Sequence, residues 1–259
     1  MAQDASYYQI AQKASRQIGS HPGLTDLQQR IQNSGSVLDL GCGEGSRLAS
    51  MMGKRVGGIG IDINRYAINL ARKSYPQHKY IAYSGKKLPF SANSFGLVYS
   101  AFVLEHTQNQ QHFINEAIRV LQHNGILIIL CPNFGAPSRR SPNSVENPLT
   151  KLYRGFTEDF RHRDLTSLGW TKVVPQKTYD NIDDDTTVEP YVRTLGTYLQ
   201  FMGFKILIQS SLWQLEPASY NPRKLLFAVL GKLGVYPLKY WGPQVWVVAQ
   251  KNRNSYPPT

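Results

Sequence analysis

The stretch VLDLGCGEG, residues 37–45, joins four mostly apolar residues to three alternate glycines. The apolar residues predict a short buried strand, and residues 46–52 behind the glycines are compatible with a helix. Glycine allows a tight backbone turn and leaves room for a ligand, because it has no Cβ. A helix that begins behind such a loop offers unpaired N–H groups to a negatively charged group. The stretch therefore predicts a strand–loop–helix unit with a ligand at the loop.

An acidic residue further along the chain indicates what kind of ligand this is. Asp62 ends the second predicted strand, and a carboxylate there can accept hydrogen bonds from both hydroxyls of a ribose. A dinucleotide-binding loop follows the pattern Gly-x-Gly-x-x-Gly, but here the third glycine, Gly45, comes one residue early. Asp39 also stands two residues before the first glycine. These departures favour a nucleoside ligand that carries an ammonium and a carboxylate in place of a pyrophosphate.

Apolar runs of strand length alternate with helical periods on both sides of this loop. Such alternation predicts a doubly wound α/β fold with a mainly parallel sheet. Strands are predicted at 36–40, 56–63, 79–83, 95–100, 125–131, 204–208 and 245–249, and helices around 67–71, at 109–122 and at 191–202.

Composition excludes several classes of protein. The chain has 259 residues, of which 41% are hydrophobic and 18% charged, so disordered, collagen-like and coiled-coil chains are excluded. It has no apolar run of the ~18 residues that cross a bilayer, and residues 1–20 lack the apolar core of a secretory signal. With two cysteines, a disulfide framework is excluded, and a cytoplasmic location is expected.

The formal net charge of +12 is spread along the chain without a block of like charges. A nucleic-acid-binding arm would be more concentrated, so we expect no nucleic-acid partner. Part of the excess lies in residues 132–175 and 211–259, outside most of the predicted sheet. A basic solvated surface is the simplest interpretation, and an anionic or membrane-associated acceptor is the alternative.

Five further segments occur in an order typical of one family. They are LPF at 88–90, SFGLVYS at 94–100, LEH at 104–106, RVLQHNGIL at 119–127 and FMGFKI at 201–206. With the glycine loop, they make the chain resemble the class I S-adenosylmethionine-dependent methyltransferases, in particular the small-molecule group. The resemblance implies one methyltransferase domain over residues 1–259 and a seven-stranded, mostly parallel sheet in the order 3-2-1-4-5-7-6, with the last strand antiparallel. It also implies S-adenosyl-L-methionine as cofactor and S-adenosyl-L-homocysteine as product.

The resemblance further implies which residues hold the cofactor. An acid and two glycines of the loop would contact the methionine part and the ribose, and Asp62 would bind the ribose hydroxyls. Ile63 would pack on the adenine, and Ser84 stands where the family often has an aspartate for the adenine amino group. The implied cofactor-binding residues are Asp39, Gly41, Gly43, Asp62, Ile63, Ser84, Gly85 and Ser100.

His106 is the candidate catalytic residue. It follows the fourth predicted strand, at the sheet edge where open α/β folds bind ligands, and its ordinary pKa of ~6.5 suits a general base. The alternative is a structural role for His106 together with Glu105. No metal site is expected, because the aspartate-rich run 180–185 lacks the glycine and the distal glutamate of a calcium loop. We interpret that run as a solvated turn.

Three segments lie outside the predicted sheet: an N-terminal helical segment, 1–34, and two insertions, 132–187 and 211–243, that would form a substrate cap. Six cations of the cap form either ordinary surface charge or a site for an anionic acceptor: Arg139, Arg140, Lys151, Arg154, Arg161 and Arg163. Residues 223–241 combine apolar, basic and aromatic side chains. We expect them to pack on the domain or on a second subunit, and peripheral contact with the inner face of a membrane is the alternative.

The predicted function is methyl transfer from S-adenosylmethionine to a small, lipid-linked or carrier-linked acceptor, at oxygen, in glycan or secondary-metabolite tailoring. RNA or protein methylation is a second interpretation, but the chain lacks the Asn/Asp-Pro-Pro-Tyr motif of base methylation. A non-catalytic binding subunit is the third interpretation. The retained Asp39, Gly41, Gly43 and Asp62 argue against it.

Overall fold

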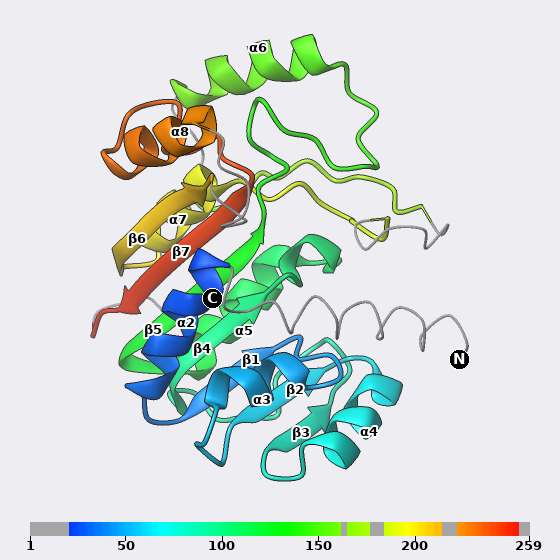
Figure 1. Cartoon of the computed structure of the whole chain (residues 1–259). Coiled ribbons are helices and arrows are strands. Elements are labelled where there is room, and N and C mark those ends of the chain that lie inside the picture. Colours follow the sequence, from blue (N-terminus) through cyan, green and yellow to red (C-terminus); the bar gives the residue numbers. More distant parts are fainter. Residues whose placement is uncertain (1–20, 162–164, 177–183, 214–221, 254–259) are drawn as a thin grey trace.

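The computed structural model describes residues 21–161, 165–176, 184–213 and 222–253. A single sheet crosses the molecule and has helices on both faces (Figure 1). Its strands are β1 (Val37–Leu40), β2 (Ile59–Asp62), β3 (Lys79–Ala82), β4 (Phe95–Ala101), β5 (Leu121–Pro132), β6 (Phe204–Leu212) and β7 (Gln244–Lys251). The helices are α2 (Pro22–Gln32), α3 (Ser46–Met52), α4 (Arg65–Ser74), α5 (Gln110–Val120), α6 (Pro148–Asp159), α7 (Val192–Phe201) and α8 (Pro222–Lys232), with a 3-10 turn, η2 (Leu104–His106).

The sheet has the predicted strand order, β3-β2-β1-β4-β5-β7-β6. The first five strands pair in parallel, and β7 runs antiparallel to both β5 and β6. The predicted doubly wound sheet is therefore confirmed. The carboxyl ends of β1, β2 and β4 meet at one edge, which is where an open α/β sheet binds its ligands.

The two faces of the sheet carry separate apolar clusters, because successive side chains of a strand point to opposite faces. On β1, Leu38 and Leu40 pack in the cluster that contains α5 and α7, whereas Val37 packs in the cluster that contains α2, α3 and α4. Burial on both faces explains why β5 is apolar almost without interruption.

The predicted boundary between the fifth strand and the helix before it was wrong. The helix expected at 109–122 ends at Val120, and β5 begins at Leu121 rather than at Gly125. Leu121 already pairs with Phe95, and the register then shifts before Leu97 pairs with Ile126. The polar residues between these two pairings are exposed, and Leu121 continues the apolar spacing of the helix although it belongs to the strand.

The two segments expected to form the cap lie beyond the sheet, with α6 and α8 at the same end of the molecule (Figure 1). β6 extends to Leu212, so the second of them begins two residues later than expected. Residues 1–20 of the predicted N-terminal segment lie outside the described residues, and α2 belongs to its remainder. Among the described helices, none is long and apolar enough to cross a membrane.

Candidate active site

The glycine loop leaves β1 with three left-handed residues. Gly41, Gly43 and Gly45 have φ angles of 81°, 53° and 82°, which residues with a Cβ rarely adopt. The loop ends at Ser46, the first residue of α3. The sequence thus places the amino end of a helix at the carboxyl edge of the sheet.

Asp62 fastens this loop to the neighbouring strand. Its Oδ2 accepts a hydrogen bond from the Gly43 N–H at 2.9 Å, and its Oδ1 accepts one from the Asn64 N–H at 2.8 Å. Asn64 in turn caps α4 by accepting from the Tyr66 N–H at 2.9 Å. Burial raises the pKa of Asp62, and the backbone N–H donors oppose that shift. Each carboxylate oxygen has a second lone pair, so the residue can still accept from ribose hydroxyls.

Asp39 is a buried carboxylate, 1% exposed, just before the loop. Among the described residues, no hydrogen bond of normal geometry reaches either of its oxygens. Burial raises its pKa to about 7, whereas the charge of Arg47 and the Tyr99 hydroxyl act to lower it. Buried carboxylates without hydrogen bonds are costly. A cationic ligand group would compensate that cost, so the site fits a cofactor that carries an ammonium.

Sequence reasoning missed Arg47 and Tyr99. Arg47 lies on α3, where it donates to the carbonyl of Ala101 at 2.6 Å and stands over the Phe102 ring. Tyr99 is fully buried in β4, the strand next to β1. Tyr99 lies within the SFGLVYS segment and Arg47 follows the glycine loop, but their positions near Asp39 depend on the pairing of β1 with β4 and on the folding of α3.

The residues predicted to contact the adenine lie after β2 and β3. Ile63 is exposed for 65% of its surface, although it is apolar. A Cβ on Gly85 would lie 3.5 Å from Ile63 Cγ2, so these two residues are neighbours. Ser84 is exposed in the same turn. An exposed apolar side chain beside a glycine is a suitable surface for a flat ring.

Ser100 and His106 stand at the end of β4. The Ser100 hydroxyl is buried and has no hydrogen-bond partner among the described residues. His106 lies in η2, with its side chain 15% exposed. Its Nδ1 is 2.8 Å from Asp185 Oδ1, and its Nε2 is 3.6 Å from Oε1 of the buried Glu105. The imidazole is therefore held between two carboxylates.

Asp185 was expected in a solvated turn, and its pairing with His106 was not predicted. Residues 180–183 of the aspartate run lie outside the described residues. The segment behind Asp185 is tied to η2, because the Thr187 N–H donates to the Glu105 carbonyl at 2.9 Å and the Thr187 hydroxyl to the Thr107 carbonyl at 2.7 Å. These bonds hold the cap against the candidate catalytic residue.

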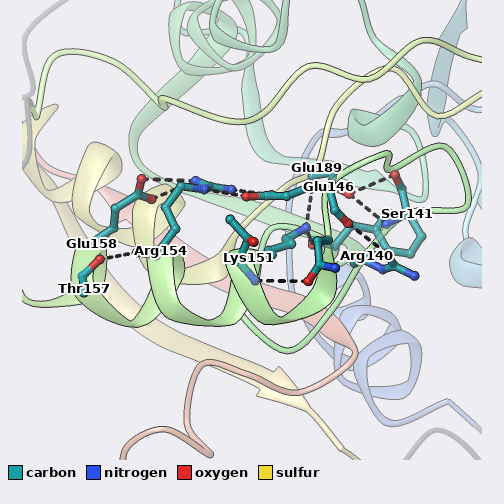
Figure 2. Close-up of polar contacts among 11 residues, drawn as sticks. Arg140, Ser141, Glu146, Lys151, Arg154, Thr157, Glu158 and Glu189 are labelled. Carbon is teal, nitrogen blue, oxygen red and sulfur yellow. Dashed lines mark hydrogen bonds and ion pairs between the residues drawn. The ribbon is translucent and has the colours of Figure 1, made fainter.

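Two of the cap cations that could have bound an anionic acceptor form ion pairs within the cap (Figure 2). Lys151 is buried and donates to Glu189 and, at 2.8 Å, to the Phe134 carbonyl. Arg154 lies between Glu146 and Glu158, at 2.8 Å and 3.1 Å. The ion pairs of Lys151 and Arg154 therefore join α6 to neighbouring segments of the chain. Arg163 lies outside the described residues.

A family model described as a methyltransferase domain matches residues 38–129, the segment from β1 to β5 that carries the glycine loop, Asp62, Ser100 and His106. Residues 38–129 therefore match a methyltransferase domain, and the similar proteins described below include S-adenosylmethionine-dependent methyltransferases. The predicted resemblance is confirmed over this segment, and the cofactor that it implies is S-adenosylmethionine. The carboxylates and the glycine loop described above are the residues of this chain that would hold it.

Individual relatives agree with this assignment. A "probable S-adenosylmethionine-dependent methyltransferase" of Mycobacterium tuberculosis is 32% identical over 136 residues, which cover 51% of this chain and 46% of that protein. A ubiquinone/menaquinone biosynthesis C-methyltransferase of Blochmanniella floridana is 26% identical over 68% of each chain. The methyltransferase thus spans about half the length of the mycobacterial relative it matches. In fold, it resembles an S-adenosylmethionine-dependent methyltransferase of Mesorhizobium loti, with a TM-score of 0.54, 17% identity and coverage of 88% and 97%.

Proposed function

We propose that the methyltransferase transfers a methyl group to an oxygen of a small, lipid-linked or carrier-linked acceptor, as in glycan or secondary-metabolite tailoring. The observation that carries this proposal is the 2.8 Å contact between His106 and Asp185. A hydroxyl acceptor has a proton that is hard to lose, so its methylation benefits from a general base. A histidine supported by a carboxylate is suited to that task.

In this proposal, some residues of the chain bind the reactants and others transfer a proton. S-adenosylmethionine, when bound, supplies an electrophilic methyl group on a sulfonium. The negative charge of Asp185 near Nδ1 favours a proton on that nitrogen, and the proposal requires the lone pair at Nε2 to take the proton of the acceptor hydroxyl. Asp185 and Glu105 then stabilise the imidazolium by their charge. The remaining acceleration comes from alignment of the two reactants at the sheet edge.

We place the reaction in the cytoplasm. Cys42 and Cys131 are both free thiols in the structure, which fits a reducing compartment.

Substitution of His106 tests the proposal. We expect His106→Ala to bind S-adenosylhomocysteine within about twofold of the parent in calorimetry, and to lower turnover about 10²- to 10⁴-fold because proton transfer loses its base. The assay uses methyl-labelled donor with a panel of sugar, phenol and polyprenyl-linked hydroxyl acceptors. Asp62→Ala serves as the opposite control, since loss of the ribose hydrogen bonds should weaken binding about 10- to 100-fold. Unchanged turnover in His106→Ala would remove this residue from the chemistry.

Carbon methylation is the second candidate, because the Blochmanniella floridana relative is named a C-methyltransferase. Determining which atom of the product carries the labelled methyl group distinguishes oxygen methylation from carbon methylation. A methyl ether or ester supports oxygen transfer, whereas a new carbon–carbon bond contradicts it and assigns His106 to deprotonation of an activated carbon acid.

A further inference from the structure

Helix α6 has its polar and apolar faces reversed relative to an ordinary surface helix. Lys151 and Asp159 are buried against the protein. The apolar residues recur at the spacing of one helix face, but that face points to solvent. Its exposed members are Leu149 (76%), Leu152, Tyr153 (75%), Phe156 and, at the end of the helix, Phe160 (66%).

Hydrogen bonds hold the polar face of α6 inward. Near its amino end, Lys151 donates to Glu189 and to the Phe134 carbonyl. At its carboxyl end, Asp159 Oδ2 accepts from the Tyr191 hydroxyl at 2.7 Å and from Trp241 Nε1 at 3.2 Å. Rotating the apolar face inward would break both sets of bonds and leave buried charges without partners. The outward apolar face is thus a fixed property of the cap.

Helix α8 extends this apolar surface. Gly231 is its only buried residue, and its large apolar side chains are exposed: Leu225, Leu226, Phe227 and Val229, followed by Leu233. Tyr236, in the segment that follows α8, packs at the end of α6, with its ring centroid 5.2 Å from that of Phe160 and 6.3 Å from that of Phe156. Both helices lie at the same end of the molecule (Figure 1). Exposed apolar surface of this extent marks an interaction site.

The charges around this surface are basic. Residues 222–243 contain four cations and no Asp or Glu; the cations are Arg223, Lys224, Lys232 and Lys239. On α6, Arg154 pairs with both Glu146 and Glu158, so one cation stands against two carboxylates at this part of the surface. Arg161, just after α6, is exposed. A partner for this surface must therefore be apolar and carry negative charge at its rim.

We propose that the exposed face of α6 and α8 binds the surface of an anionic lipid bilayer, with both helices lying in the interface. Apolar side chains there would enter the acyl boundary, and the basic residues would meet anionic headgroups. Tyrosines such as Tyr153 suit the interface, because they combine an apolar ring with a polar hydroxyl. A second copy of the chain fits less well, because a two-fold contact would bring the cations of residues 222–243 of one copy toward those of the other.

This inference goes beyond the proposed function and does not depend on it. It states where the protein docks, and it holds whether or not His106 is the base. It also indicates that an acceptor embedded in or attached to a membrane would be within reach of the cap.

Co-sedimentation with sucrose-loaded vesicles tests the proposal. We expect the full chain to bind vesicles of phosphatidylcholine with 30 mol% phosphatidylglycerol at least about tenfold more tightly than pure phosphatidylcholine, and to lose most of that preference in 0.5 M NaCl. The double variant Leu149→Glu/Leu226→Glu, on the two helices, should reduce binding at least about tenfold. Val56→Glu is the matched control, since Val56 is an exposed apolar residue before β2, outside the cap.

Two further measurements, of S-adenosylhomocysteine binding and of oligomeric state, complete the test. All variants should bind S-adenosylhomocysteine as the parent does, which shows that the domain is folded and separates docking from methyl transfer. No pelleting of the folded parent with anionic vesicles, or an equal loss in Val56→Glu, would overturn the proposal. So would a concentration-dependent dimer in analytical ultracentrifugation that the double variant dissolves, because a second copy would then cover the surface.

Discussion

At the scale of single residues, the glycines of the loop have two different explanations. A Cβ on Gly41 would lie 2.5 Å from the Val103 methyl groups, and one on Gly45 would lie 2.7 Å from the Tyr80 ring. Both glycines are therefore required by the protein's own packing, in addition to their left-handed backbone. Gly43 is different, because its N–H is bound by Asp62. A glycine in such a loop thus indicates that another group lies close to the backbone, and this group can be a side chain of the protein as well as a ligand.

The pKa of Asp39 gives a prediction about stability. That pKa rises from 3.8 to about 7 in the folded protein. Between these values the unfolded chain releases a proton that the folded protein retains, so the free energy of unfolding falls as the pH rises from about 4 to about 7. Asp39→Asn removes this penalty. We expect the variant to be more stable than the ligand-free parent at pH 8 by roughly 1–4 kcal/mol, and little different at pH 4, in urea unfolding.

The matched control for this prediction is Asp26→Asn. Asp26 is a partly exposed carboxylate that pairs with Arg30 within α2. Its substitution should change the free energy of unfolding by less than about 1 kcal/mol at either pH. A difference between Asp39→Asn and the parent that does not grow with pH would contradict the assignment of a raised pKa.

At the scale of elements, a buried ion pair at the amino end of α6 helps to attach this helix, together with the hydrogen bonds of Asp159 at its carboxyl end. Glu189 accepts from the Ser141 N–H and hydroxyl at 2.9 Å and 3.0 Å, and its other oxygen accepts from Lys151 (Figure 2). Burial lowers the pKa of Lys151, and the Glu189 carboxylate opposes that shift. Lys151 and Glu189 stabilise each other's charge, so removal of one side chain leaves the other charge buried without a partner.

We therefore expect Lys151→Met to lower the free energy of unfolding by about 3–5 kcal/mol, because Glu189 stays buried without its cation. The double variant Lys151→Met/Glu189→Gln should recover most of that loss, since no lone charge remains. Chemical denaturation of both variants measures the effect. Arg154→Met, which removes a partly exposed ion-pair network, is the control and should cost about 1 kcal/mol or less. Equal losses in all three variants would argue against a special role for the buried pair.

At the scale of the whole molecule, the strand order determines how far apart the two cysteines lie. Cys42 follows β1 and Cys131 lies in β5, with β4 between these strands. Both cysteines are free and buried. Burial raises the pKa of both thiols, so neither forms a reactive thiolate in the folded protein.

This arrangement predicts the thiol chemistry of the native protein. We expect an aromatic disulfide reagent to titrate no thiol in the folded methyltransferase at pH 8 and two thiols in guanidinium chloride, since the chain contains two cysteines. A reducing agent should leave the thermal midpoint unchanged. Fast modification of the native protein would show that one cysteine is accessible and contradict the buried assignment.

The sequence by itself predicted the strands of a mainly parallel sheet and the edge where the predicted cofactor residues gather, and its resemblance to the family implied the strand order. Alternating apolar spacing distinguishes strands from helices locally, and parallel strands bring Asp39, the glycine loop and Asp62 to one edge whatever the rest of the chain does. Only the tertiary structure decided the partners of those residues. Asp185 reaches His106 through folding of the cap, and α6 turns its apolar face outward because its buried charges find partners inside. Spacing along a chain carries no information about contacts between segments that meet only after folding.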